Sequence, residues 1–412
     1  MDAFSAEEQV KLKEIIQKQR IPNYSVEVKK VMEDGDGYLG VLTGLNILDT
    51  EGNKKLSFAI KTAPKSKKLR EMFPTRNTFL REIYVYETLF PEFQNFQEQY
   101  HISKPFNSTP KYYGSSSEDL NEMIVLENLK ESKYKLHTRR EPMDSHHLSL
   151  VMAEYARLHA VSLAMRKLDP EKFKELSDKV KLNVLMEHEM KKDRPIDQVF
   201  SDKKANVMFE PVFEVLKGRE KELEAVEKFS KDGMKLFFES YTEDSGLKVI
   251  SHSDCWSANM LFKYEDESYP TIPTKVCLID WQLASLAPPI FDISYFFYIC
   301  AGKKDLNNYM RFLNVYHTVL GDSLKDFGLD IEEIYPYDRF ESDWRKLSKM
   351  GYFMTIVMLM QCLSETKTHN FEEMADKGQD IYDMNQRKQE ISDVYRQRMG
   401  DLVEFLVKNQ LL

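Results

Sequence analysis

The sequence predicts an α+β protein with two unequal parts, a small β-rich N-terminal lobe and a large, mainly helical C-terminal lobe. Strand-like alternation of apolar and polar residues, broken by glycine-rich turns, fills residues 25–62. Helical periodicity prevails from about Lys130 onward, and one β-like island interrupts it at residues 248–284. We therefore expect the N-terminal lobe to span residues 1–130 and the C-terminal lobe residues 131–412.

Composition and charge are those of a folded protein with a sizeable core. Of the 412 residues, 42% are hydrophobic, and the net charge of −9 is spread along the chain without a basic tail that would attract nucleic acid. The N-terminus lacks the apolar region of a secretory signal, and the most apolar stretches are shorter than the roughly 20 residues of a membrane span. We expect a cytoplasmic protein without a membrane partner. Free thiols are the simplest interpretation of the widely spaced cysteines Cys255, Cys277, Cys300 and Cys362.

The N-terminal lobe should contain five strands, a surface helix in the segment MDAFSAEEQVKLKEII (1–16) and a second helix after the third strand. Residues 25–62 form three strand-like runs joined by turns, which predicts an antiparallel meander. A helix should follow over Arg70–Phe90, where apolar residues recur at helical spacing, and Pro91 should end it. The segments KYYGSSS (111–117) and MIVLENL (123–129) predict the two further strands.

The C-terminal lobe should be helical on both sides of the β-like island. Residues Leu148–Met165 form a strongly apolar helix, and residues 170–241 alternate charged and apolar positions with few helix breakers. The chain after the island is again helical and ends in the amphipathic stretch DVYRQRMGDLVEFLVKN. Two short apolar strands flank a polar connection within the island, which marks it as the candidate site.

The island carries the residue spacing of a kinase catalytic loop. His252, Asp254 and Asn259 reproduce the pattern H-x-D-x-x-x-x-N, in which the aspartate orients the acceptor hydroxyl and the asparagine binds metal. The next apolar strand ends in Asp280, which places a second carboxylate beside this loop. Asn259 and Asp280 can supply the oxygen ligands that Mg²⁺ bound to ATP requires.

The other parts of an ATP site occur upstream in kinase order. Gly35, Gly37 and Gly40 form G-x-G-x-x-G between two strands, where glycines let backbone amides approach phosphates. Lys61 follows on the third strand in F-A-I-K, and Glu82 lies on the next helix, where it can pair with Lys61. Glycines also form ordinary hairpin turns, so the prediction depends on the ordered set of parts.

These motifs resemble the ecdysteroid kinase-like, or CHK kinase-like, family of insects, which is related to choline kinases and aminoglycoside phosphotransferases. The resemblance covers most of the chain. It rests on ordered motifs: GDGYLGVL (35–42), FAIKT (58–62), FLREIYVY (79–86), VLENL (125–129), ARLHA (156–160), HSDCWSANMLF (252–262) and LIDWQ (278–282).

The resemblance implies a bilobal protein-kinase-like fold and an ATP- and Mg²⁺-dependent kinase that phosphorylates the hydroxyl of a small-molecule alcohol. It also implies roles for the candidate residues: Asp254 as catalytic base, Asn259 and Asp280 as metal ligands, Lys61 and Glu82 as the ATP-binding pair, and Glu127 to Leu129 as the adenine hinge.

The resemblance also implies supporting roles. Asp292, which follows A-P-P-I-F and precedes an apolar helix, would be the structural carboxylate that braces the catalytic loop. His252 should be architectural, a buried histidine that hydrogen-bonds the backbone, and His159 should be an ordinary core histidine. Two positions depart from the family pattern: Ser253 stands where many relatives have glycine, and Asn128 where an acidic residue is usual.

The family implies ecdysteroid hormones, plant toxins or other xenobiotics as acceptors, and hence hormone metabolism or detoxification. A choline-type cation would need an aromatic cage, for which the candidates are Trp256, Trp281 and Trp344. A sterol would need apolar lining such as the methionine-rich helix Phe353–Met360.

Three other functions stay open on the sequence: a choline- or aminoglycoside-type kinase, a non-catalytic kinase-fold binding protein, and a protein kinase. A pure binding protein would not require Asn259 and Asp280 together. The protein kinase is the least supported, because Trp281-Gln282 replaces F-G after Asp280 and no A-P-E element follows.

Overall fold

The computed structural model describes residues 1–30, 40–138, 140–191, 202–242, 246–266, 271–363 and 391–412. Gly35 and Gly37 of the predicted glycine-rich loop lie outside the described residues. The strands are β1 (Ser25–Lys30), β2 (Val41–Leu48), β3 (Lys54–Thr62), β4 (Tyr112–Ser116), β5 (Met123–Glu127), β6 (Lys135–Leu136), β7 (Val249–Ser251), β8 (Met260–Tyr264), β9 (Pro273–Leu278) and β10 (Ser285–Ala287).

The five N-terminal strands form one antiparallel sheet in the order β1-β2-β3-β5-β4. This confirms the predicted meander of three strands and the two further strands. Helix α1 (Ala6–Lys18) begins at a Ser5 capping box and packs its apolar side on this sheet. Its residues Leu12, Ile15 and Ile16 are buried against strand residues such as Phe58.

The helical segment after β3 differs from the prediction. It comprises α2 (Lys67–Met72), α3 (Thr75–Tyr84), a π-helical turn (Val85–Leu89) and α4 (Phe90–Gln99). The prediction that Pro91 ends the helix is wrong, because the chain stays helical to Gln99. The Phe90 N–H donates to the Val85 carbonyl across the wider π-turn, and Pro91 then occupies the first turn of α4, where its missing N–H costs little.

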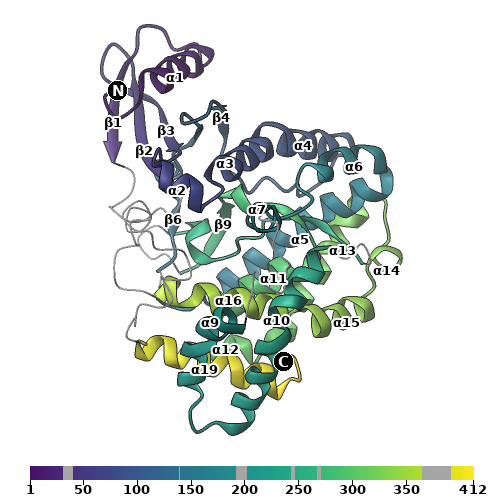
Figure 1. Ribbon diagram of the computed structural model, residues 1–412. Helices are drawn as coiled ribbons and strands as arrows, with labels where there is room; N and C mark the ends of the chain where they lie inside the picture. The colour runs from purple at the N-terminus through teal and green to yellow at the C-terminus, as the bar shows by residue number, and fades with distance from the viewer. Residues whose placement is uncertain (31–39, 139, 192–201, 243–245, 267–270, 364–390) are drawn as a thin grey trace.

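The larger part of the chain is mainly helical, and with the sheet this confirms the α+β class (Figure 1). Its helices are α5 (Ser145–Leu168), α6 (Pro170–Asp178), α7 (Val184–Met190), α9 (Asp202–Val215), α10 (Glu220–Thr242), α11 (Pro289–Cys300), α12 (Lys303–Leu306), α13 (Tyr309–Asp326), α14 (Ile331–Ile334), α15 (Tyr337–Leu347), α16 (Lys349–Leu363) and α19 (Asp393–Lys408). Among the residues that the structure describes, no helix is both long and apolar enough to cross a membrane.

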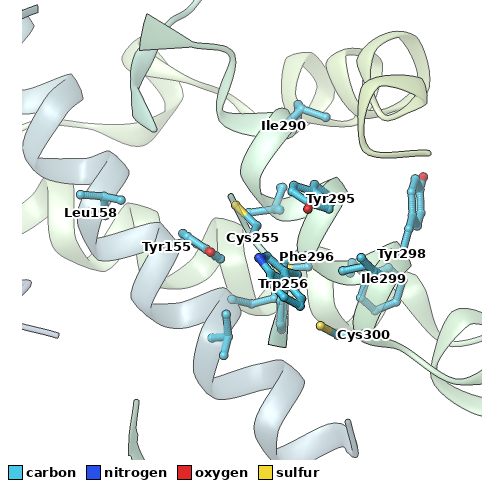
Figure 2. Close-up of a cluster of buried hydrophobic side chains, with 14 of the residues drawn as sticks. Tyr155, Leu158, Cys255, Trp256, Ile290, Tyr295, Phe296, Tyr298, Ile299 and Cys300 are labelled. Atoms are coloured by element: carbon cyan, nitrogen blue, oxygen red, sulfur yellow. The ribbon is translucent and has the colours of Figure 1, made fainter. Parts of the chain in front are cut away.

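Two small sheets within the helical part hold the β-like island. In one antiparallel sheet β8 lies in the middle and pairs with β6 and with β9, and in the other sheet β7 pairs with β10. The loop between β7 and β8 is anchored in the core: Figure 2 shows Cys255 and Trp256 among side chains of α5 and α11, including Tyr155 and Phe296. Cys255 and Trp256 are buried, so a rigid helical layer supports the candidate catalytic loop.

Candidate active site

A buried charge cluster joins the sheet, helix α3 and the end of strand β9. The Lys61 ammonium on β3 lies 2.7 Å from a carboxylate oxygen of Glu82 on α3 and 2.7 Å from one of Asp280. Glu82 is buried, whereas the Asp280 side chain is 27% exposed. The structure therefore brings three predicted residues into contact, with Asp280 facing the accessible side.

The electrostatics of this cluster keep Lys61 charged. Burial alone would lower the pKa of Lys61, but the carboxylates of Asp280 and Glu82 outweigh burial and raise this pKa above its ordinary value. A permanent cation at this position suits the binding of phosphate oxygens. Glu82, which is fully covered, fixes the ammonium by a charge-assisted hydrogen bond.

Gly40 is the predicted loop glycine that the structure describes, and it lies against Lys61. A Cβ added at Gly40 would be 3.2 Å from the Lys61 Cγ and 3.3 Å from the Phe79 ring. These separations are at the short limit of real contacts, so a larger residue would push on the lysine stem. The absence of a side chain at Gly40 thus helps to place Lys61.

Asp254 and Asn259 are linked directly inside the loop between β7 and β8. The Asn259 side-chain amide donates to the Asp254 carboxylate at 2.9 Å and to the Asp254 carbonyl at 3.0 Å. The Ile279 N–H donates to the Asn259 carbonyl at 3.0 Å, which holds Asp280 next to this loop. Because its N–H₂ group is engaged, the Asn259 amide oxygen is the atom left to bind a cation.

Asp254 has a perturbed ionisation. Burial raises the pKa of Asp254 to about 7, and the nearby Asp280 carboxylate adds to this rise, while the hydrogen bond from Asn259 opposes it. A carboxyl group that titrates near neutral pH can accept a proton from an alcohol more readily than an ordinary aspartate.

His252 is fully buried and has an architectural environment. Its Nε2 is 2.9 Å from the Ile279 carbonyl oxygen, and its Nδ1 is 3.2 Å from the Asp254 N–H. Burial lowers the pKa of His252, so the ring is neutral. With Nδ1 accepting from a backbone N–H, we assign the proton to Nε2, which then donates to Ile279.

Asp292 on α11 holds the backbone of the candidate catalytic loop. Its two carboxylate oxygens accept hydrogen bonds from the backbone N–H groups of His252 at 2.8 Å and Ser253 at 3.0 Å. Burial alone would raise the pKa of Asp292, but the hydrogen bonds, led by that of His159, lower this pKa below its ordinary value. The expectation that Asp292 precedes the helix is wrong, because it lies in the first turn of α11.

His159 takes part in this network in a way that the sequence did not reveal. It is fully buried on α5, as expected of a core histidine, and its Nε2 lies 3.2 Å from the Asp292 carboxylate. Its Nδ1 lies 2.8 Å from the Tyr316 hydroxyl. Only the packing of α5 on α11 and α13 brings these groups together, so no sequence spacing could have indicated them.

The backbone conformation of Ser253 is one that favours glycine. Ser253 has φ of 66°, in the left-handed region that non-glycine residues rarely adopt. A 2.7 Å hydrogen bond between the hydroxyls of Ser253 and Ser285 on β10 offsets part of the cost of this left-handed conformation. Asp280 also has a left-handed conformation, with φ of 64°.

The candidate hinge lies where β5 leaves the sheet. The Glu127 side chain accepts from the Ser132 hydroxyl, and Asn128 donates its side-chain amide to Ser57 at 3.0 Å. Leu129 is buried in a small apolar cluster with Leu261 and Cys277. Half-buried Tyr134 and Ile279 pack against this cluster beside the candidate hinge.

Arg81 is a site-adjacent residue that the sequence analysis missed. It precedes Glu82 on α3, and its guanidinium donates to the carbonyls of Leu182, at 2.9 Å, and Ala284. It also pairs with Glu187 of α7 at 3.2 Å. Its position beside Glu82 in the FLREIYVY motif was the available signal, but only the fold shows that it ties α3 to the helical part.

The donor set fits a hard divalent cation. The Asn259 amide oxygen and the Asp280 carboxylate can supply two oxygen ligands, although one Asp280 oxygen already accepts from the Lys61 ammonium. Within the described part of the chain, no group of three or more histidine, cysteine or acidic residues could hold a metal by itself. A cation here would therefore need phosphate oxygens or water as further ligands.

Comparisons with known proteins give one family and several structural neighbours. Residues 34–329, well over half of the chain, match the ecdysteroid kinase-like family. The GDP complex of wild-type aminoglycoside 2'-phosphotransferase-IIIa is 15% identical with a TM-score of 0.43, over 97% of this chain and 99% of that one. The gentamicin–APH(2")-IIa complex is 13% identical with a TM-score of 0.37, over 84% of this chain and 96% of that one. No curated protein matches.

The family match includes strands β2 to β10 and therefore the candidate hinge, the candidate catalytic loop and the Asp280 segment, whereas β1 lies before it. The chain therefore belongs to the ecdysteroid kinase-like family of kinase-like phosphotransferases.

Proposed function

We propose that this protein transfers the γ-phosphate of ATP to a hydroxyl group of a largely apolar small molecule. The observation that carries the proposal is the arrangement of two adjoining groups: Asp254 bonded to Asn259, and Asp280 bonded to Lys61. A phosphoryl-transfer site needs this combination of an acceptor-side carboxylate, oxygen ligands for a metal and a cation for phosphates.

In the proposed reaction, the acceptor oxygen forms a bond to the γ-phosphorus while the bond from this phosphorus to the β,γ-bridging oxygen breaks. The acceptor proton goes to Asp254, and the products are a phosphate ester and ADP. Lys61 would bind phosphate oxygens, and Glu82 would hold Lys61 in place. Asn259 and Asp280 would hold Mg²⁺, which supplies neutralisation of phosphate charge when bound.

The apolar surface next to the catalytic loop supports an apolar acceptor. Half-buried Leu182, Phe237 and Met354 lie beside β10, packed on a buried cluster that includes Tyr241 and Met350, so only the three half-buried side chains can contact an acceptor. These side chains come from α10, α16 and the segment before α7. Methionine and phenylalanine adapt well to a ring system such as that of a sterol, so an ecdysteroid or an apolar plant toxin is the acceptor class that we propose.

The competing acceptor classes have less support. The three tryptophans proposed for a choline cage, Trp256, Trp281 and Trp344, are at most 3% exposed, so they cannot enclose a cation. A protein substrate would need a docking segment, but only Trp281–Leu283 and Ser285–Ala287 separate Asp280 from the prolines that begin α11.

The test is phosphorylation of a defined panel of alcohols. We expect purified protein with MgATP to give a phosphate ester of at least one ecdysteroid, sterol alcohol or plant glucoside, detected by mass spectrometry. Choline, an aminoglycoside and a peptide array should give no product. We expect Asp254→Asn to reduce the rate by at least about 10³-fold, because it removes the proton acceptor.

Two results would contradict the proposal. One is the absence of product from every alcohol together with unaltered behaviour of Asp254→Asn, which would favour a non-catalytic binding protein. The other is robust phosphorylation of peptides. A preference for ecdysteroids over plant glucosides, or the reverse, would distinguish hormone metabolism from detoxification.

A further inference from the structure

A cavity of about 840 Å³ lies between α4, the connecting segment of residues 100–111 and strand β4. It includes none of the residues proposed to act on ATP or acceptor apart from Glu127 at the hinge. Small-molecule sites in proteins are commonly of this size, mostly apolar, with a few placed polar groups. The proposed phosphotransferase chemistry does not use this cavity.

The walls of the cavity are aromatic and its mouth is polar. Aromatic rings from α4, the π-turn, the connecting segment and β4 line it: Tyr86, Phe90, Phe93, Phe106 and Tyr112. Exposed polar side chains also line it: Gln94, Glu98, His101, Asn107 and Lys111. Such walls suit a flat apolar body, and such a mouth suits hydrogen-bonding groups at one edge.

The cavity is held open by hydrogen bonds within its walls. The Gln97 side chain donates to the Phe106 carbonyl at 3.1 Å and accepts from the Phe106 N–H at 2.6 Å. The Ser108 carbonyl accepts from the Leu278 N–H at 2.7 Å, and Ser103 donates to Asp326 on α13. The connecting segment is therefore fixed to α4, to β9 and to α13, and the cavity is pre-formed.

A continuous chain of aromatic contacts joins this cavity to the catalytic loop. The ring centres of His252 and Trp281 are 4.4 Å apart, and those of Trp281 and Phe90 are 4.8 Å apart. Phe90 then contacts Tyr86 at 5.7 Å, and Tyr86 stacks on Tyr112 at 6.1 Å. The last three rings line the cavity, so a ligand there would touch the chain directly.

Tyr86, on the π-turn, lies in the middle of these aromatic contacts. π-turns are rare in helices and are found frequently at functional sites. Tyr86 is 2% exposed, and its hydroxyl has no hydrogen-bond partner among the described residues. The Tyr86 ring therefore separates the cavity from Glu82, and its hydroxyl could still form a hydrogen bond.

We propose that this cavity binds a planar, largely apolar small molecule with a polar edge, and that the bound molecule restrains the catalytic loop through the aromatic chain from Tyr112 to His252. The site is separate from the acceptor surface at α10 and α16. Binding there does not depend on the proposed phosphotransferase activity.

The test uses 8-anilinonaphthalene-1-sulfonate, which combines a flat naphthalene ring with a polar sulfonate at one edge and fluoresces when bound. The variant Gln94→Trp fills the cavity mouth, and Asn95→Trp places the same side chain on an exposed position of α4 that does not line the cavity. We expect Gln94→Trp to bind the probe at least about tenfold more weakly than wild type, because the mouth is filled, and Asn95→Trp to bind it like wild type. Circular dichroism and thermal melting would verify that both variants are folded.

Hydrogen exchange tests the coupling. We expect the probe to slow amide exchange in residues 249–259 by at least about twofold in wild type and Asn95→Trp but not in Gln94→Trp. Equal probe binding by the two tryptophan variants would overturn the site. Probe binding without any change in exchange at residues 249–259 would overturn the coupling. Neither readout requires turnover, so a failed acceptor panel would leave both results interpretable.

Discussion

At the scale of single residues, Asp254 is costly to bury in its ionised form. Its pKa in the folded protein is about 7, compared with 3.8 for an ordinary aspartate. The folded state therefore binds a proton more tightly than the unfolded state, and stability falls as the pH rises from about 4 to about 7. Above pH 7 the full cost is present, and below pH 4 it vanishes.

Because ionised Asp254 lowers the stability of the folded state, we predict that Asp254→Asn stabilises the protein at high pH. The substitution removes the charge and keeps an oxygen that can accept a hydrogen bond from Asn259. At pH 8 we expect the variant to have a free energy of unfolding higher than that of wild type by roughly 1–4 kcal/mol. The difference should shrink steadily between pH 7 and pH 4. Urea denaturation at several pH values measures it, and a difference that does not depend on pH would contradict the raised pKa.

Ser253 offers a second test at the residue scale. Ser253→Gly relieves the left-handed strain, which is about 1 kcal/mol, but it loses the hydrogen bond to Ser285, which contributes about as much. We expect stability within about 1 kcal/mol of wild type. Ser253→Ala keeps the strain and loses the hydrogen bond, so it should be less stable by about 1–2 kcal/mol. Thermal denaturation that ranks Ser253→Ala equal to or above Ser253→Gly would rule out strain at this position.

At the scale of elements, the crossing of α11 and α16 determines how α11 presents Asp292 to the catalytic loop. Gly351 on α16 lies directly against α11: an added Cβ would be 2.4 Å from the Ser294 carbonyl carbon and 2.4 Å from the Tyr295 nitrogen. Backbone atoms cannot swing aside as a flexible side chain can. The two helices must therefore separate if a side chain is added at Gly351.

We expect Gly351→Ala to lower the free energy of unfolding by about 2–3 kcal/mol, even though alanine favours helix formation. The matched control is Gly321→Ala on α13, where the nearest atom is the flexible Ile331 Cδ1 at 3.3 Å. This control should be neutral or slightly stabilising. Chemical denaturation of the two variants compares them, and similar stabilities would mean that the helices can separate without cost.

At the scale of the whole molecule, Arg81 links the sheet side of the site to the helical part. Its guanidinium donates to two carbonyl oxygens of the helical part and pairs with Glu187. The Arg81 side chain is only 6% exposed, so these bonds are shielded from water. Through the neighbouring Glu82, Arg81 would also hold Lys61 in position.

We expect Arg81→Met to destabilise the protein by about 3 kcal/mol, because it leaves buried carbonyls without a donor. It should also weaken MgADP binding by at least about tenfold in isothermal titration calorimetry. The control is Arg76→Met, at a half-exposed arginine of the same helix that pairs with Asp119 and Glu122. If Arg76→Met weakened MgADP binding as much as Arg81→Met, the link to the helical part would not be what positions Lys61.

Local patterns in the sequence predicted most helices and strands and the order of the candidate site residues along the chain. Period-two alternation gave the antiparallel sheet, and the spacing of apolar residues gave α5 and α19, because side chains must match the face that they bury. The π-turn before Pro91 was not predicted, since one extra residue in a helical turn leaves no mark on composition. The proposed boundary between the two lobes at residue 130 depends only on the change from strand-like to helical periodicity in the sequence.

The sequence by itself determined that this chain carries the ordered parts of a kinase-like site, because those parts are defined by residue type and spacing along the chain. Only the tertiary structure decided which side chains touch. It placed Arg81, His159 and the aromatic chain from Tyr112 to His252, and it buried the three tryptophans. These contacts join helices and strands far apart in sequence, and their geometry depends on how the elements pack.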